Sequence, residues 1–145
     1  MPRYIQSLLR SPKLWLAVRC MIALLFVYSG LEKVLDVEGS FAEMRAAGLN
    51  PAWLFNYASA LVLLGGSYFI LFDKAIWLGA GILSIFLVLT IVVVHSFWNM
   101  SGLHAIIALY FALEHVAVIG GLMAVAMTSH YRQLLKQYET GAMLG

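Results

Sequence analysis

Four long apolar stretches, at residues 14–31, 53–72, 75–94 and 105–127, constrain the fold of this 145-residue chain more than any other feature. A helix needs about 20 apolar residues to cross the roughly 30 Å hydrocarbon core of a bilayer. No water reaches that core, so each stretch must satisfy its backbone groups as a helix. The chain is 63% hydrophobic and 11% charged, against about 45–50% and about 25% in soluble domains. The sequence therefore predicts an all-α integral membrane protein, a single four-helix bundle with short loops.

The one long connection is the loop at residues 32–52. Residues 40–47 within it carry apolar side chains at helical spacing, so we expect a short helix on the membrane surface. Ser40 is placed to cap its N-terminus. Gly48 is expected to end this short helix, and Pro51 to open the next long one.

Lysine and arginine are unevenly distributed over the connections, which predicts the topology. The two terminal segments and the turn at residues 73–74 hold six of these residues: Arg3, Arg10, Lys13, Lys74, Arg132 and Lys136. The opposite side holds only Lys33 and Arg45. Because basic residues accumulate on the cytoplasmic side, we expect both termini to be cytoplasmic.

Charge and cysteine content exclude several classes of function. The net charge is +2 with no basic run, so a nucleic-acid partner is not indicated. Cys20 is the single cysteine, which excludes an internal dithiol relay and any zinc or iron–sulfur site built from cysteines. The sequence contains no metal-binding repeat, phosphate loop or nucleophile elbow. No metal site or self-contained catalytic motif is therefore predicted.

Small and polar residues recur along one face of several stretches, which is typical of helix–helix contacts in membranes. In the first stretch this stripe consists of Arg19, Ala23, Phe26, Gly30 and Lys33. In the third it consists of Gly81, Ser84, Val88, Ile91 and His95, and in the fourth of Tyr110, Glu114, Ala117, Gly121 and Val125. Close packing is expected at Gly30, Gly65, Gly66, Gly81, Gly120 and Gly121.

Five polar residues within or beside the apolar stretches form a candidate polar core: Arg19, Lys33, His95, Glu114 and His115. A charge in the bilayer centre costs at least about 2.5–3.5 kcal/mol on insertion scales. Arg19 lies near the end of its stretch, so its side chain can either reach the surface or pair inside. Glu114 is too short to reach the surface and must be protonated, paired or facing water. We predict that Arg19 and Glu114 share one site between the first and fourth helices.

Two histidines in a helical bundle raise the question of haem. His95 lies near the end of its stretch and His115 near the middle of the next, which is a poor arrangement for one bis-histidine iron. A neutral, hydrogen-bonded histidine is the commoner case. The sequence therefore argues against haem and shows no other cofactor motif.

Several motifs, in their order along the chain, resemble the DoxX family of small bacterial membrane proteins. Residues 19–33 (RCMIALLFVYSGLEK) resemble the first helix of the family, and Asp36, Gly48 and Pro51 fit the loop that follows. Residues 65–66, 95–98 and 118–122 resemble the glycine pair, the His-x-aromatic-Trp end and the second glycine pair of the later helices. The resemblance covers about residues 15–128. The chain departs from the family at residues 60–64, which lack an acid, and at 114–115, which replace Lys-Asn.

The resemblance implies a multi-pass protein of the bacterial inner membrane that serves as a membrane subunit or anchor of a redox complex. Since the family is named after a subunit of a thiosulfate:quinone oxidoreductase, the first hypothesis is that the chain anchors an oxidoreductase partner and helps to form a quinone pocket. Two other functions stay open: a small transporter or proton-linked permease using Glu114, and a membrane scaffold or assembly factor without chemistry. A homo-oligomer is compatible with each of them.

Overall fold

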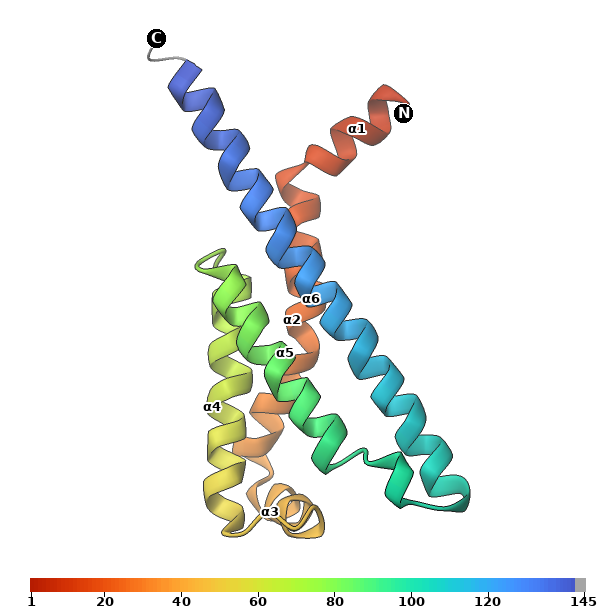
Figure 1. Cartoon of the computed structure of the whole chain (residues 1–145). Helices are drawn as coiled ribbons and strands as arrows, with labels where there is room; N and C mark the ends of the chain where they lie inside the picture. The colour runs from red at the N-terminus through yellow and green to blue at the C-terminus, as the bar shows by residue number, and fades with distance from the viewer. Residues whose placement is uncertain (143–145) are drawn as a thin grey trace.

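The computed structural model describes residues 1–142, and these residues form helices and short connections without a strand (Figure 1). In chain order the elements are α1 (Arg3–Arg10), α2 (Pro12–Leu35), α3 (Val37–Ala46), α4 (Ala52–Leu71), α5 (Ile76–Val93), the 3-10 helix η1 (Phe97–Asn99) and α6 (Gly102–Ala142). Four helical segments, containing α2, α4, α5 and α6, are long and apolar enough to cross a membrane. The predicted all-α membrane fold is confirmed.

Different helices and connections lie at the two ends of the bundle. α1, the far end of α6 and the turn between α4 and α5 lie at one end, here called the terminal end (Figure 1). α3 and η1 lie at the other, here called the loop end. This arrangement follows from four long helices joined by connections that are short except for residues 36–51.

α6 is much longer than its apolar stretch. It runs for 41 residues, whereas the stretch predicted to span ends at residue 127. The polar segment that follows is rich in residues with high helix propensity, including Arg132, Leu134, Leu135 and Lys136, and carries no proline. The helix therefore continues beyond the apolar stretch at the terminal end.

The loop-end helix α3 begins earlier than predicted. Its N-cap is Asp36, whose carboxylate accepts a hydrogen bond from the backbone N–H of Gly39 at 3.1 Å. The prediction that Ser40 is the cap is wrong, because Ser40 lies inside the helix and is buried. The predicted stop is confirmed: Gly48 has a φ of +76°, a left-handed conformation that favours glycine. Ala52 opens α4 directly after Pro51, as expected.

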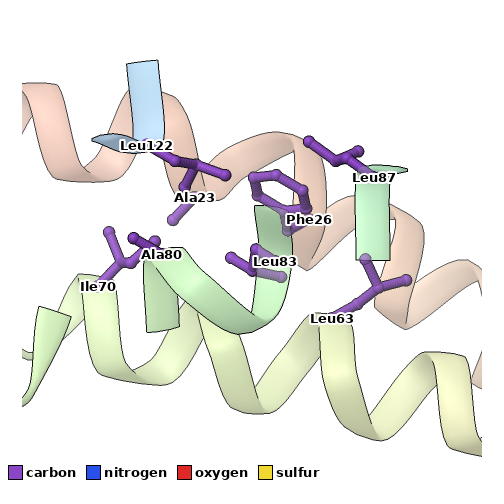
Figure 2. Packing of buried hydrophobic residues seen from close by; sticks show 8 residues of the cluster. All are labelled: Ala23, Phe26, Leu63, Ile70, Ala80, Leu83, Leu87 and Leu122. Atoms are coloured by element: carbon purple, nitrogen blue, oxygen red, sulfur yellow. The ribbon is translucent and has the colours of Figure 1, made fainter. Parts of the chain in front are cut away.

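The apolar core lies where α2, α4, α5 and α6 meet (Figure 2). Its buried side chains are Ala23, Phe26, Leu63, Ile70, Ala80, Leu83, Leu87 and Leu122. The stripe predicted for the first helix is buried in full, and Trp15 extends it by one turn. A face that mixes charged and small residues therefore identified the packed side of α2 correctly.

The stripes predicted for α5 and α6 are displaced from the faces that are buried. On α5 the buried residues are Ile76, Gly79, Ala80, Leu83 and Leu87. On α6 they are Ala108, Ala112, Leu122, Val125 and Ser129. Of the predicted α6 stripe, Tyr110, Glu114 and Ala117 are exposed and only Val125 is buried. Lipid does not penalise apolar side chains, so apolar patterning alone does not separate the packed face from the lipid face.

The glycines differ sharply in what surrounds them. A Cβ added at Gly30 would lie 2.7 Å from Leu64 Cγ, and one at Gly66 would lie 2.6 Å from Leu83 Cγ. At Gly121 the neighbour is Ile22 Cδ1, at 3.1 Å, where α6 crosses α2. Gly65, Gly81 and Gly120 have no such neighbour within 4 Å. The chain by itself therefore shows no close packing at these last three, and their packing role stays a prediction.

A close approach between two helix backbones occurs at Gly79, a glycine that the sequence analysis missed. A Cβ on Gly79 of α5 would lie 2.7 Å from the carbonyl oxygen of Gly66 and 2.8 Å from Phe69 Cβ, both on α4. Gly66 and Gly79 together let α4 and α5 pack with almost no side chain between their backbones. Because the two backbones lie so close, the turn at residues 72–75 has only a short distance to cover between the end of α4 and the start of α5.

Candidate functional site

Arg19 is buried at the terminal end of the bundle, where it binds the turn between α4 and α5. Its Nη1 lies 3.4 Å from the Oδ2 of Asp73 and donates to the carbonyl oxygens of Leu71 (3.3 Å) and Ile70 (3.5 Å). Those carbonyls end α4, where the helix dipole favours a cation. Arg19 is 8% exposed, so it does not extend to the surface.

Trp15, one turn before Arg19 on α2, completes this cluster. Its indole Nε1 donates to Asp73 Oδ2 at 3.1 Å, and its ring centre lies 5.4 Å from the Arg19 guanidinium carbon. Asp73 therefore accepts a hydrogen bond from Trp15 and forms an ion pair with Arg19, both on α2. The cluster fixes one end of α2 against the α4–α5 turn.

The backbone of this turn is bent sharply to bring the Asp73 carboxylate toward α2. Asp73 has a φ of +57° and Ala75 a φ of +44°. Both are left-handed conformations that are costly for residues other than glycine, although aspartate tolerates them better than most. Sequence analysis treated residues 73–74 only as a turn. One sequence signal could have identified this contact. Asp73 is an acid that lies directly beside an apolar stretch, on the same side of the membrane as Arg19.

An apolar groove of about 560 Å³ opens between α2 and α6 beside this cluster. Its walls are Leu9, Leu14, Val18, Met21, Ile22, Gly121, Ala124 and Val125. Trp15, Thr128 and Arg132 supply the polar part of the lining at the terminal end. Small side chains on α6, Gly121 and Ala124, keep the groove open.

Arg132 is placed to bind an oxygen acceptor within the groove. Its guanidinium carbon lies 5.5 Å from the Trp15 ring centre. Unlike Arg19, it forms no ion pair with any residue between 1 and 142. A guanidinium, a hydroxyl and an indole ring above an apolar trough suit an amphipathic molecule with acceptor oxygens on its head.

Lys33 belongs to a separate cluster at the loop end. Its Nζ lies 3.3 Å from Glu43 Oε2 on α3, and its backbone carbonyl accepts a hydrogen bond of 2.8 Å from Asn56 Nδ2 on α4. Asn56 is completely buried, and its Oδ1 has no partner among the described residues. Sequence analysis missed Asn56. These contacts tie α2 to both α3 and α4.

The two histidines are neighbours, contrary to the separation assumed from the sequence. Their ring centres lie 5.0 Å apart with the rings at 77°, and His95 also stacks on Phe111 at 5.1 Å. The backbone turns at residues 94–95 after α5, which brings His95 against α6. Edge contact between the rings leaves no space for a porphyrin, so these histidines do not fit a bis-histidine haem. Within residues 1–142 no three His, Cys, Asp or Glu side chains are grouped to hold a metal.

Glu114 directly precedes His115 on α6 and interacts with it through charge alone. It is exposed on α6 and forms no hydrogen bond or ion pair within the part of the chain that the structure describes. The prediction that Arg19 and Glu114 share one site is therefore wrong, because Arg19 satisfies its charge at Asp73 and the end of α4. The five candidate residues do not form one polar core. They form three clusters, and Glu114 lies beside the histidine cluster without a hydrogen bond or ion pair in the described residues.

Comparison with known proteins gives one match. The sequence model of a family described as DoxX matches residues 14–96, which extend from α2 to just beyond α5. No curated protein and no solved structure matches the chain. α6 lies outside the matched segment, and so does the glycine pair at residues 120–121 on which part of the resemblance rested.

Proposed function

Because this chain belongs to the DoxX family, we propose that it is a membrane subunit of a quinone-linked redox complex in the bacterial inner membrane. The observation that carries the proposal is the groove between α2 and α6, apolar along its length and lined by Trp15, Thr128 and Arg132 at one end. A quinone has the matching form: a ring with two carbonyl acceptors and a long apolar tail.

Each part of the groove has a role in this proposal. The Arg132 guanidinium and the Thr128 hydroxyl donate hydrogen bonds to a quinone carbonyl, and the Trp15 ring lies beside the quinone ring. The apolar walls of α2, among them Val18 and Met21, cover the tail. Reduction of a quinone held there to the quinol would take two electrons and two protons. In this proposal the electrons come from an oxidoreductase subunit that the membrane helices anchor, and the protons come from water at the terminal end of the groove, beside the exposed Thr128.

The first test measures quinone binding to the protein in lipid nanodiscs, with decylubiquinone as the probe. Ala124→Phe fills the groove and is expected to weaken binding about tenfold or more. Met123→Phe is the matched control, because Met123 is exposed on another face of α6. Arg132→Gln is compared in the same way with Lys136→Gln, one turn beyond. Equal affinities within each pair, or no binding by the unmodified protein, would favour a scaffold instead.

We also propose that both termini are cytoplasmic. The structure places α1, the α4–α5 turn and the end of α6 at one end of the bundle, and this end carries six Lys and Arg residues against two at the other. A green fluorescent protein fused to the C-terminus should therefore fluoresce, since it folds only in the cytoplasm. An alkaline phosphatase fused there should be inactive. An active phosphatase at the C-terminus would reverse the proposed orientation.

A further inference from the structure

The first helix, α1, is set at an angle to α2 and lies outside the bundle (Figure 1). Ser11 separates the two helices with a φ of −59° and a ψ of 130°, a non-helical conformation favoured in the residue before a proline. None of the residues of α1 is buried. α2, which begins at Pro12, is long and apolar enough to span the membrane. α1 therefore comes directly before a membrane span, at the terminal end.

α1 is amphipathic, with an apolar and a polar side. At about 100° per residue, its apolar side chains cover one continuous side of the helix. These side chains are Tyr4, Ile5, Leu8 and Leu9, and all but Ile5 are more than half exposed. A short basic helix of this kind typically lies in the membrane interface, with its apolar side at the boundary of the acyl chains. The span that follows holds α1 at that depth.

The polar side of α1 faces an open hollow of about 530 Å³. Its lining consists of Arg3, Gln6, Ser7, Arg10, Ser11 and Pro12. Arg3 and Arg10 are two helical turns apart, about 10.5 Å along the axis, so both side chains can reach a group placed between them. Neither arginine forms an ion pair with any residue between 1 and 142. The first acid in the chain is Glu32, so no carboxylate close in sequence neutralises this charge.

We infer that α1 binds the phosphate groups of anionic phospholipids, with Arg3 and Arg10 on the phosphate and the apolar side in the surface of the bilayer. A guanidinium donates paired hydrogen bonds to phosphate oxygens. The hydroxyls of Ser7 and Ser11 supply further donors in the same hollow.

The chemistry of α1 favours an anionic lipid over other phosphate compounds. The apolar side of the helix places the hollow at the depth of the lipid headgroups, where a free anion has no advantage. Basic residues beside a membrane are attracted to lipids with a net negative charge, and Lys13 adds a third positive charge to the two arginines. The inference is independent of the quinone proposal, because neither arginine lines the groove between α2 and α6.

The first test measures the lipid selectivity of the full chain in phosphatidylcholine bilayers, with spin-labelled phosphatidylglycerol and phosphatidylcholine as probes. The unmodified protein should prefer phosphatidylglycerol, and Arg3→Gln combined with Arg10→Gln should reduce this preference about fivefold or more. The matched control combines Lys74→Gln with Lys136→Gln, which removes the same charge at the same end of the bundle but outside the hollow. The control should stay within about twofold of the parent.

Three results of this measurement would overturn the inference. They are no preference in the parent, a preference that the arginine variant retains, and an equal loss in the two double variants. Inorganic phosphate, added at constant ionic strength, should leave the preference unchanged. Displacement of the labelled lipid by inorganic phosphate would show that the hollow binds a free anion instead.

A second test locates the apolar side of α1. The chain has one cysteine, Cys20, so a Cys20→Ser background allows nitroxide labels at Leu8→Cys and Gln6→Cys, on opposite sides of the helix. The label at residue 8 should be about threefold more accessible to oxygen dissolved in the bilayer, and the label at residue 6 to a water-soluble nickel chelate. Equal accessibility to the chelate would place α1 in water. Protection of the residue 8 label from both reagents would show that protein covers this side, and either result would contradict the inference.

Discussion

Replacing Gly79 with alanine is expected to lower the free energy of unfolding by about 2 kcal/mol or more, although only one methyl group is added. The new Cβ would lie 2.7 Å from the Gly66 carbonyl oxygen and 2.8 Å from Phe69 Cβ. Both atoms are attached to the α4 backbone, so neither can rotate away. α4 and α5 would have to separate, and the core contacts of Leu83 and Ile70 would loosen with them.

The matched control is Gly81→Ala, two residues along the same helix. No atom lies within 4 Å of the Cβ position there, and alanine has the higher helix propensity by about 1 kcal/mol. This variant should be neutral or more stable. The measurement is reversible unfolding of the purified protein in mixed micelles. Equal destabilisation at the two positions would mean that the close contact of α4 with α5 is not formed.

Replacing Asp73 with alanine is expected to cost about 3 kcal/mol, which is at the lower end for breaking a buried ion pair because Asp73 is partly exposed. The Asp73 side chain is 37% exposed and that of Arg19 is 10% exposed, so the guanidinium would be left buried without its counter-charge. The Trp15 indole N–H would also lose its acceptor. Alanine is moreover less tolerant than aspartate of a φ of +57°.

Two further variants separate these contributions. Asp73→Asn keeps an acceptor for Arg19 and Trp15 and also tolerates the left-handed backbone, so it should recover a large part of the loss. Lys74→Ala changes the exposed neighbour in the same turn and should stay within about 0.5 kcal/mol of the parent. Unfolding in mixed micelles measures all three. Should the asparagine variant be as unstable as the alanine variant, the ion pair rather than the hydrogen bonds would account for the whole effect.

Much of the helical fold could be predicted from the sequence, since the length and apolarity of a spanning helix are set by the bilayer itself. The boundaries of α4 and α5 agree with prediction within a residue. The buried face of α2 was also predicted, because Arg19 and Lys33 are the residues that most need partners. In a membrane helix, the positions of the charged residues therefore indicate the packed face even where the apolar pattern does not.

The pairing of the polar residues could not be predicted in the same way. Arg19 was matched with Glu114 because both were expected to avoid lipid, but a helical repeat says nothing about which helix lies opposite. The actual partner is a turn residue, Asp73, whose backbone conformation the sequence does not reveal. His95 was placed too far from His115 because the bend after α5 has no clear sequence signal.

The two ends of α2 are fastened to α4, and this has a mechanical consequence for α6. Arg19 binds the α4–α5 turn at one end, and the Lys33 carbonyl accepts from Asn56 at the other. α6 has no such ties to α2: it lies along α5, crosses α2 near Gly121, and no side-chain hydrogen bond joins it to α2 within residues 1–142. The α2 wall of the groove is therefore fixed by polar side chains at both ends of that helix. The wall that carries Arg132 meets α2 only through apolar contacts and the Trp15 ring.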